Sequence, residues 1–294
     1  MRTILLTGKN GQVGWELQRT LAPLGKVVAL DTDELDLANP GAIRQAVRSI
    51  RPNIIVNPAA YTAVDKAESE AELAQSVNAA APGVFAEEAK TLGAWMVHYS
   101  TDYIFDGTKL GAYLESDAPH PQSVYGKSKL AGEVAVRAAG GKYLILRTSW
   151  VYGNRGHNFM LTMLRLARER KELRVVDDQV GAPTWCRSLA EITSQILAQL
   201  HTPGIKEAAS EVSGTYHLTS SGSVSWYGFA AEILHQSGMQ PLPDLVAIPS
   251  HEYPTPAIRP KNSVLSNNKL YRTFGLDAGD WRDNLRLCMQ EIQR

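Results

Sequence analysis

Residues 5–17, LLTGKNGQVGWEL, decide the fold of this chain. They place Gly8, Gly11 and Gly14 in the turn between an expected first strand and an amphipathic helix. Glycines suit this turn because the chain bends sharply, the backbone must approach a pyrophosphate, and the helix must pack tightly on the strand. The free N–H groups at the start of the helix attract the anion. The spacing G-x-x-G-x-x-G differs from the commoner G-x-G-x-x-G, but the strand–turn–helix context is the one that the motif requires.

The rest of the N-terminal half alternates strand-like and helical segments. The strand-like runs are TILLTG, KVVALD, NIIVNPAA, AWMVHYS and YLILRTS. This alternation predicts an α/β fold with a Rossmann-type, doubly wound parallel sheet covered by helices on both faces. We expect residues 1–150 to form the dinucleotide-binding domain. Residues 151–294 are expected to form a smaller, mainly substrate-binding region with some chain returning to the core, including helices at 158–170 and 188–200.

Composition and charge exclude several classes of partner. The 30 basic and 30 acidic residues cancel without a block of like charge, so neither nucleic acid nor an anionic membrane is expected as a partner. The start, MRTILLTGKNG, turns polar too early for a signal peptide, and no apolar run reaches the roughly 18 residues of a membrane span. A soluble, cytoplasmic protein is expected. Cys186 and Cys288 lack metal-ligand spacing and are expected to be reduced thiols.

The segment YGKSKLAGE, residues 125–133, carries a second signal. Tyr125 and Lys129 lie four residues apart in an expected helix, so they share a face with about 5–6 Å between Cβ atoms. Among the 11 tyrosines, only Tyr125 has a lysine at this spacing. A nearby ammonium favours the phenolate, so the pKa of Tyr125 is expected to fall from about 10 toward neutral.

Thr101 follows the fourth expected strand in the segment HYSTDYIFDG. It would emerge at the carboxyl edge of the sheet, where α/β proteins bind ligands, and could hold a substrate carbonyl oxygen beside the phenol. A helix cap or turn is the alternative for Thr101 taken alone. Its combination with a nucleotide loop and the Tyr125/Lys129 pair favours an active site.

The cofactor signal is divided between NADH and NADPH. Asp31 ends the second expected strand, where a carboxylate accepts hydrogen bonds from free ribose hydroxyls and repels a 2′-phosphate. Lys9 lies inside the glycine loop, where its ammonium could offset one carboxylate. We therefore expect that both NADPH and NADH are accepted.

Several segments together resemble the dTDP-4-dehydrorhamnose reductases, a branch of the extended short-chain dehydrogenase/reductase superfamily. They are GKNGQVGWEL, NPAAYTAVDKAE, HYSTDYIFDG, VYGKSKLAGE, LRTSWVYG, DQVGAPT and YPTPAIRP, and they run over nearly the whole chain. The resemblance implies reduction of the 4-keto group of dTDP-4-dehydro-L-rhamnose by NADPH or NADH. This is the last step of dTDP-L-rhamnose synthesis, which serves cell-surface polysaccharides such as lipopolysaccharide.

The resemblance also implies residue roles. Tyr125 would donate a proton to the C4 oxygen, Lys129 would hold the nicotinamide ribose, and Thr101 would hydrogen-bond the same C4 oxygen. The candidate cofactor residues are Gly8, Gly11, Gln12, Val13, Gly14, Asp31, Asp36, Leu37, Ala60, Tyr61, Thr62, Tyr99 and Lys129. The candidate substrate residues are Thr101, Asp102, Trp150 and, as a diphosphate contact, Arg259.

Other side chains are given ordinary structural roles. Core packing is the expectation for the tryptophans at 15, 95, 226 and 281, and His98 and His217 are expected to be buried structural residues. For Arg259, a surface salt bridge is the alternative to a diphosphate contact. No metal cluster is expected. A homodimer is compatible with the resemblance, but Arg187 lies where a metal site would want a carboxylate, so a magnesium-bridged dimer is doubtful.

Two other functions remain open at this point. One is a different nucleotide-sugar ketoreductase, epimerase or dehydratase. The other is a non-catalytic, dinucleotide-binding regulatory subunit, which would predict erosion of the Tyr125, Lys129 and Thr101 set, and all three residues are intact.

Overall fold

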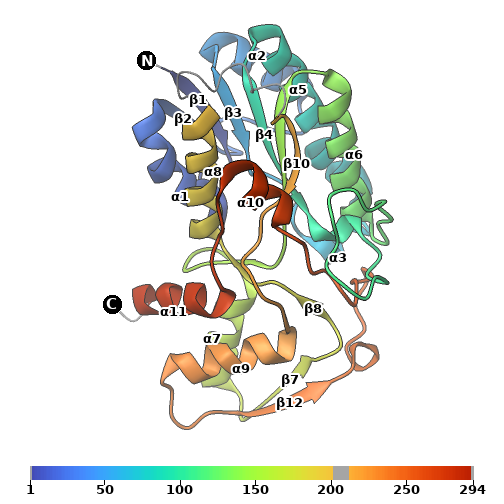
Figure 1. The fold of residues 1–294 in the computed structure, drawn as a ribbon. Helices are drawn as coiled ribbons and strands as arrows, with labels where there is room; N and C mark the ends of the chain where they lie inside the picture. The colour runs from blue at the N-terminus through green and yellow to red at the C-terminus, as the bar shows by residue number, and fades with distance from the viewer. Residues whose placement is uncertain (1, 201–211, 293–294) are drawn as a thin grey trace.

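The computed structural model describes residues 2–200 and 212–292, which fold into a larger lobe with a central sheet and a smaller lobe beside the carboxyl edge of that sheet (Figure 1). The central sheet is fully parallel, with the order β10-β5-β4-β3-β1-β2. Its strands are β1 (Thr3–Thr7), β2 (Lys26–Leu30), β3 (Ile54–Asn57), β4 (Trp95–Thr101), β5 (Lys142–Thr148) and β10 (Gly214–His217). The order reverses between β1 and β3, and such a switch point marks the ligand crevice of a doubly wound sheet.

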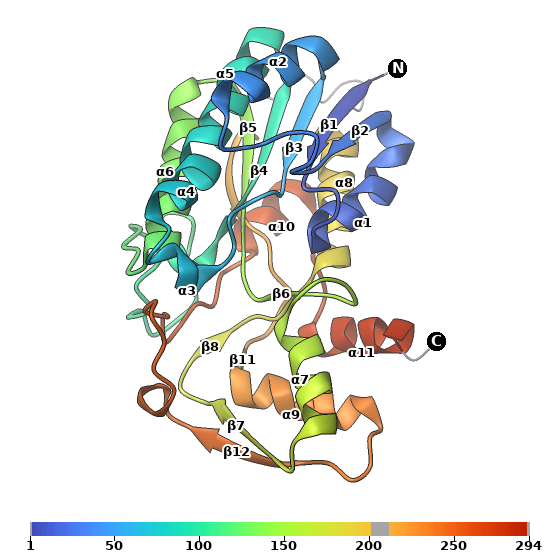
Figure 2. The same ribbon diagram turned by 180° about the vertical axis from the view of Figure 1, so that it is seen from behind.

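Helices cover both faces of the central sheet, as the sequence predicts. The helices of the larger lobe are α1 (Gln12–Leu21), α2 (Pro40–Ile50), α3 (Val64–Ala67), α4 (Ala71–Gln75), α5 (Ala81–Leu92), α6 (Val124–Ala139), α8 (Cys186–Leu200) and α10 (Asn268–Phe274). Short turns η1 (Ala22–Leu24), η2 (Ser76–Ala80) and η3 (Asp102–Ile104) join them. Helices α1 and α8 lie on one face, whereas α2, α5 and α6 lie on the other (Figures 1 and 2).

The apolar runs of the strands are continuous because both faces of the sheet are buried. In β1, Ile4 and Leu6 point to the core cluster shared with α1 and α8, and Leu5 points to the cluster shared with α2 and α5. All three side chains are fully buried. Because successive side chains of β1 point to opposite faces of the sheet, this one short apolar run contributes to both core clusters.

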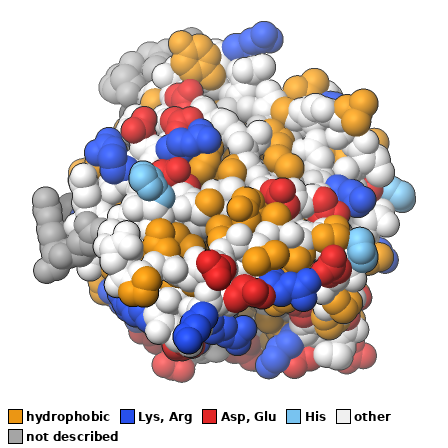
Figure 3. All heavy atoms as spheres, turned by 90° about the horizontal axis from the view of Figure 1, so that it is seen from below, with side chains coloured by type: hydrophobic (Ala, Val, Ile, Leu, Met, Phe, Trp, Pro, Cys, Tyr) orange, Lys and Arg blue, Asp and Glu red, His pale blue; other side chains and the backbone are white. Residues whose placement is uncertain are grey.

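The smaller lobe gathers segments from the C-terminal half around a core of its own. Its elements are β6 (Val151–Tyr152), α7 (Phe159–Glu169), β7 (Glu172–Val176), β8 (Val180–Gly181), β9 (Thr184–Trp185), β11 (Val224–Ser225), α9 (Trp226–Ser237), β12 (Asp244–Ile248), η5 (Ser250–Glu252) and α11 (Trp281–Ile292). Strands β7 and β12 pair in parallel, and Phe229, Trp281 and Leu285 are buried between the helices. Basic, acidic and apolar side chains are interspersed on the face seen in Figure 3.

Not all of the C-terminal half lies in the smaller lobe. Helix α8 packs on α1, where the Thr20 hydroxyl donates to the carbonyl of Ala190 at 3.1 Å, and β10 extends the central sheet beside β5. The helices expected at 158–170 and 188–200 are confirmed as α7 and α8. Within residues 2–200 and 212–292, no helix combines the length and apolar character needed to cross a membrane.

One of the four tryptophan predictions is wrong. Trp95 and Trp281 are buried as expected. Trp15 is 41% exposed on α1, where the guanidinium of Arg155 stacks over its ring at 3.5 Å from the centroid. Trp226 is partly buried and packs against the core of the smaller lobe, as expected, and it also lines a pocket. Apolar sequence neighbours predicted burial for all four, but the exposed side of an amphipathic helix and the wall of a pocket also accept large aromatic rings.

Candidate active site

The glycine loop forms a tight cradle at the start of α1. Gly8 has a φ of 61°, and a Cβ on Gly14 would lie 1.9 Å from the carbonyl oxygen of Gly8, so a side chain at Gly14 is excluded. The N-cap of α1 is Gly11, which provides no side-chain cap. The first N–H groups of α1 are therefore open to an anion. This arrangement fits the pyrophosphate of a dinucleotide, with Gln12 and Val13 opening the helix.

The loop after β2 is connected to the glycine loop by hydrogen bonds. The carboxylate of Asp31 accepts from the backbone N–H of Asn10 at 2.8 Å. Partial burial raises the pKa of Asp31, but backbone hydrogen bonds from Asn10 and Thr32 outweigh it, so the pKa is lowered and the carboxylate stays charged. Lys9 forms an ion pair with Glu34. The Lys9 ammonium thus offsets one carboxylate, as expected, and this carboxylate is that of Glu34.

Further candidate cofactor residues lie at the same edge of the sheet. Asp36 and Leu37 follow β2, and the Asp36 carboxylate accepts from the N–H of Ala38 at 2.8 Å. Gln12 accepts a hydrogen bond from the Asn158 amide at 2.9 Å, which joins the glycine loop to the start of α7. The structure therefore places Asp36 and Leu37 in the loop after β2 and Gln12 beside the start of α7.

Asn78 organises the segment after β3, although the sequence analysis did not single it out. It is fully buried in the π-helical turn η2. Its amide accepts from the N–H of Tyr61 at 2.8 Å and donates to the carbonyl of Tyr61 at 3.0 Å. It also donates to the Ser128 hydroxyl on α6 at 3.0 Å. Asn78 thus fixes the candidate segment Ala60, Tyr61 and Thr62 against the helix that carries Tyr125.

Helix α6 presents Tyr125 and Lys129 toward the carboxyl half of β4. The helix begins where the Ser123 hydroxyl accepts from the N–H of Gly126 at 3.1 Å, an N-cap that fixes the first turn. The Lys129 ammonium donates to the carbonyl of Tyr99 at 2.6 Å and is 2% exposed. The phenol of Tyr99 points away from α6 and pairs with the Thr193 hydroxyl of α8 at 2.6 Å.

Thr101 and Asp102 stand at the end of β4 next to Tyr125. The Thr101 hydroxyl accepts from the N–H of Tyr103 at 3.2 Å, donates to the Asp102 carboxylate at 3.0 Å, and also hydrogen-bonds Tyr125. The ring of Tyr103 packs edge-on against that of Tyr125, with 5.5 Å between centroids. Burial raises the pKa of Asp102 to about 6. Phenol, hydroxyl and carboxyl thus form one hydrogen-bonded group.

The prediction of a lowered pKa for Tyr125 is wrong in this structure. Burial raises the pKa of Tyr125 to about 12, and its hydrogen bond with Thr101 opposes this only in part. The same burial lowers the pKa of Lys129 to about 8, against the attraction of Glu133. Sequence spacing places the two residues on one face, but it does not reveal that desolvation is the largest influence on the pKa of each. Tyr125 is therefore fully protonated at neutral pH.

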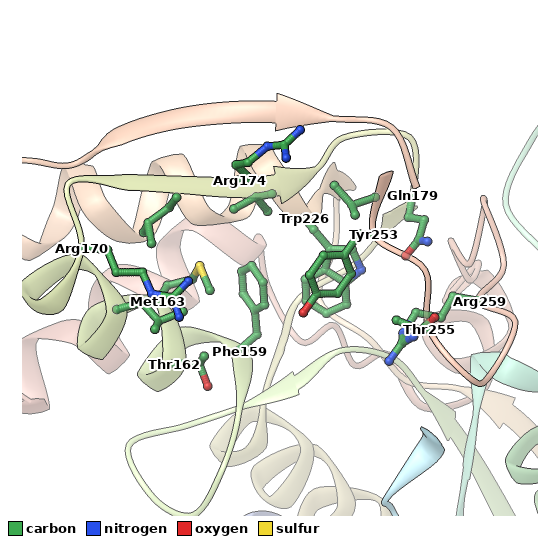
Figure 4. Close-up of a pocket in the computed structure, with 14 residues that line it drawn as sticks. Phe159, Thr162, Met163, Arg170, Arg174, Gln179, Trp226, Tyr253, Thr255 and Arg259 are labelled. Carbon is green, nitrogen blue, oxygen red and sulfur yellow. The ribbon is translucent and has the colours of Figure 1, made fainter. Parts of the chain in front are cut away.

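A pocket of about 360 Å³ opens in the smaller lobe (Figure 4). The aromatic side chains of Phe159, Trp226 and Tyr253 gather at its centre, while Arg170 and Arg259 lie at opposite ends. Flat apolar rings flanked by guanidinium groups suit a base and the phosphates attached to it.

Trp150 connects this pocket to the central sheet. It follows β5 and has a φ of 48°, a conformation that is rare for a bulky residue. Its ring stacks on Trp226 with 3.4 Å between centroids and an interplanar angle of 5°. The backbone of Gly181 lies against the same indole, because a Cβ on Gly181 would come within 2.5 Å of it. Trp150 is thus held at the boundary between the lobes.

The residues near the doubtful magnesium site form ion pairs. Arg187 on α8 pairs with Glu16 of α1 and with Glu291 of α11. Among residues 2–200 and 212–292, no group of three or more metal-ligating side chains is present.

Comparison with known proteins assigns the chain to a family. The RmlD substrate binding domain family matches residues 1–294. The chain is 50% identical to the dTDP-4-dehydrorhamnose reductase of Burkholderia thailandensis, covering 98% of each chain. It is 48% identical to that of Escherichia coli, covering 98% of this chain and 97% of the relative. A dTDP-4-dehydrorhamnose reductase from Bacillus anthracis, solved in complex with NADP, superposes with a TM-score of 0.91 at 37% identity over 99% of both chains.

Proposed function

This chain belongs to the dTDP-4-dehydrorhamnose reductase family, and from this premise we propose that it reduces the 4-keto group of dTDP-4-dehydro-L-rhamnose to give dTDP-L-rhamnose. The observation that carries the proposal is the meeting of Thr101, Tyr125 and Lys129 at the sheet edge that also bears the glycine loop. The intact set argues against a non-catalytic regulatory subunit.

NADPH or NADH, when bound, supplies the hydride that reduces C4. In our proposal, Gly8, Gly11 and Gly14 leave room for the pyrophosphate, and Asp31 lies on the side of the adenosine ribose. The N–H groups that open α1 face the anion without a competing side-chain cap. Both cofactors are accepted in our proposal, because Asp31 favours the free ribose of NADH, whereas the Lys9 ammonium, which pairs with Glu34, is available to exchange that partner for the 2′-phosphate of NADPH.

Tyr125 acts as the general acid. As negative charge grows on the C4 oxygen, its phenol transfers a proton to that oxygen. A raised pKa suits this role, because the phenol keeps its proton at neutral pH until an alkoxide, which is a stronger base, forms beside it. Thr101 orients the same oxygen, and the Lys129 charge beside the carbonyl of Tyr99 stabilises the phenolate left behind.

The substrate spans both lobes in this proposal. The sugar lies between Tyr125, Asp102 and Trp150, and the nucleoside occupies the pocket walled by Phe159, Trp226 and other residues of the smaller lobe. A deep aromatic pocket at the outer end and a proton donor at the inner end together favour a nucleotide-linked sugar over a free ketone.

The test is turnover of the purified protein with dTDP-4-dehydro-L-rhamnose. We expect absorbance of the reduced nicotinamide to fall with NADPH and with NADH, and dTDP-L-rhamnose to be identified by mass spectrometry and NMR. Parallel reactions with dTDP-glucose and UDP-glucose test for dehydratase and epimerase activity, which consume no reduced cofactor. Binding of NADPH without its oxidation by the ketosugar would contradict the proposal.

A further inference from the structure

One ion pair joins the cofactor side of the site to the smaller lobe. Asp65 lies on the short helix α3, four residues after Tyr61, and Arg259 lies in the segment that follows η5. The Asp65 carboxylate accepts from Nη2 of Arg259 at 2.8 Å with one oxygen. Its other oxygen accepts from the backbone N–H of Ala257 at 3.2 Å. Both oxygens of Asp65 are therefore used to hold residues 257–259 against the larger lobe.

The second nitrogen of the Arg259 fork is not used in this way. Nη1 is buried and has no hydrogen-bond partner among residues 2–200 and 212–292. A buried guanidinium N–H without an acceptor is unfavourable, and such groups in native proteins call for an explanation such as a ligand. The fork geometry of arginine matches two oxygens of a phosphate or carboxylate. Asp65 holds Nη2, whereas Nη1 has no partner at normal hydrogen-bond geometry among the described residues, although the Tyr103 phenol lies beside the guanidinium.

The position of Arg259 indicates what its free nitrogen meets. Arg259 lies at one end of the aromatic pocket (Figure 4). The phenol of Tyr103 interacts with its guanidinium, and the Tyr103 ring in turn packs against Tyr125. Arg259 therefore stands between the pocket and the proton donor. A nucleotide sugar with its nucleoside in the pocket and its sugar at Tyr125 brings its diphosphate to this position.

We propose that Asp65 is a positioning residue that holds Arg259 by Nη2 so that Nη1 is presented to the substrate diphosphate. The inference rests on the proposed function, because it uses the same substrate orientation. Asp65 thereby affects the affinity for substrate, and it does so only through Arg259. This role differs from that of the preceding residues Ala60, Tyr61 and Thr62, which are candidate cofactor residues.

The experiment compares dTDP with thymidine as ligands of the NADPH-bound protein by isothermal titration calorimetry. We expect Asp65→Asn to weaken dTDP binding about tenfold or more and to leave thymidine binding unchanged, because only dTDP carries the phosphates. Arg259→Met is expected to give a similar loss, and the double variant is expected to lose little more than Arg259→Met alone. Glu72→Gln removes one exposed carboxylate from the neighbouring helix α4 and serves as the charge-matched control.

Steady-state kinetics give a second readout. The KM for the ketosugar nucleotide should rise in Asp65→Asn, whereas the KM for NADPH and kcat stay near wild type. Asp65→Glu keeps a carboxylate and should recover part of the loss, and it serves if the asparagine variant folds poorly. Equal losses for dTDP and thymidine, or a full additional loss in the Arg259→Met background, would overturn the role of Asp65. Failure of the wild-type protein to bind dTDP would overturn the proposed function and this inference together.

Discussion

Replacing Tyr125 by phenylalanine removes one oxygen and tests the central step of the mechanism. The ring and its edge-on packing against Tyr103 stay in place, so the fold and the cofactor cradle are expected to be unaffected. The Thr101 hydroxyl keeps its bonds to Asp102 and to the N–H of Tyr103. The change therefore isolates the loss of the proton donor.

The size of the effect follows from the acidity of the groups that remain. Burial places the pKa of Tyr125 at about 12, whereas bulk water, the replacement donor, has a pKa of about 15.7. If about half of this difference in acidity is felt in the transition state, the loss is roughly 10²-fold. Loss of positioning adds to this, so we expect turnover to fall by roughly 10²–10⁴-fold, or about 3–5 kcal/mol in activation free energy.

The assay is oxidation of NADPH at saturating ketosugar, with cofactor affinity measured separately by fluorescence titration. Tyr216→Phe is a matched control, because it also removes the phenol oxygen of a buried tyrosine. That oxygen donates to the carbonyl of Val212, far from Thr101 and Tyr125. Turnover of Tyr125→Phe within threefold of wild type would refute the reasoning. The proton would then have to come from Thr101 or from water.

Three further outcomes are expected. Lys129→Met should lower both turnover and cofactor affinity. Wild-type turnover should decline above about pH 8, because burial lowers the pKa of Lys129 to about 8 and the charged form is lost above that value. A turnover rate that stays flat to about pH 10 would argue against a role for the charge of Lys129. Gly14→Ala should abolish cofactor binding measured by calorimetry, since its Cβ would lie 1.9 Å from the Gly8 carbonyl, whereas Gly111→Ala, where a Cβ meets nothing within 4 Å, should bind normally. Lys9→Ala should lower kcat/KM for NADPH more than for NADH, and Glu34→Gln, which releases Lys9, should raise kcat/KM for NADPH selectively. Equal effects on both cofactors would show that this pair only shapes the loop.

The sequence was sufficient for the fold and for the placement of Tyr125 and Lys129 on one face of a helix, because both depend on local patterns. Strand–turn–helix context and glycine spacing predict the cradle, and helical spacing places Tyr125 and Lys129 on one face. Electrostatics could not be predicted in the same way. The pKa of Tyr125 depends on burial by segments far away in the sequence, so the predicted direction of its shift was wrong.

The residues missed by sequence reasoning act through long-range contacts. Asn78 lies 17 residues from Tyr61 and 50 from Ser128, and its role appears only when the π-helical turn brings the three together. Asp65 was also missed, because it meets Arg259, which the sequence did single out, from 194 residues away. Trp226 packs against the core of the smaller lobe, as its apolar sequence neighbours predict, but its second role as a pocket wall could not be predicted from them.

The path of the chain between the lobes limits how the protein can be divided or recombined. Helix α8 and strand β10 come from the C-terminal half, yet they complete the larger lobe. A fragment ending at residue 150 would leave the face of α1 that packs on α8 open to water, including the fully buried Leu17 and Leu21. To exchange substrate specificity with a relative, several separate segments must therefore be transferred, because no single contiguous segment contains the whole smaller lobe. A split-protein reporter divided at residue 150 should aggregate.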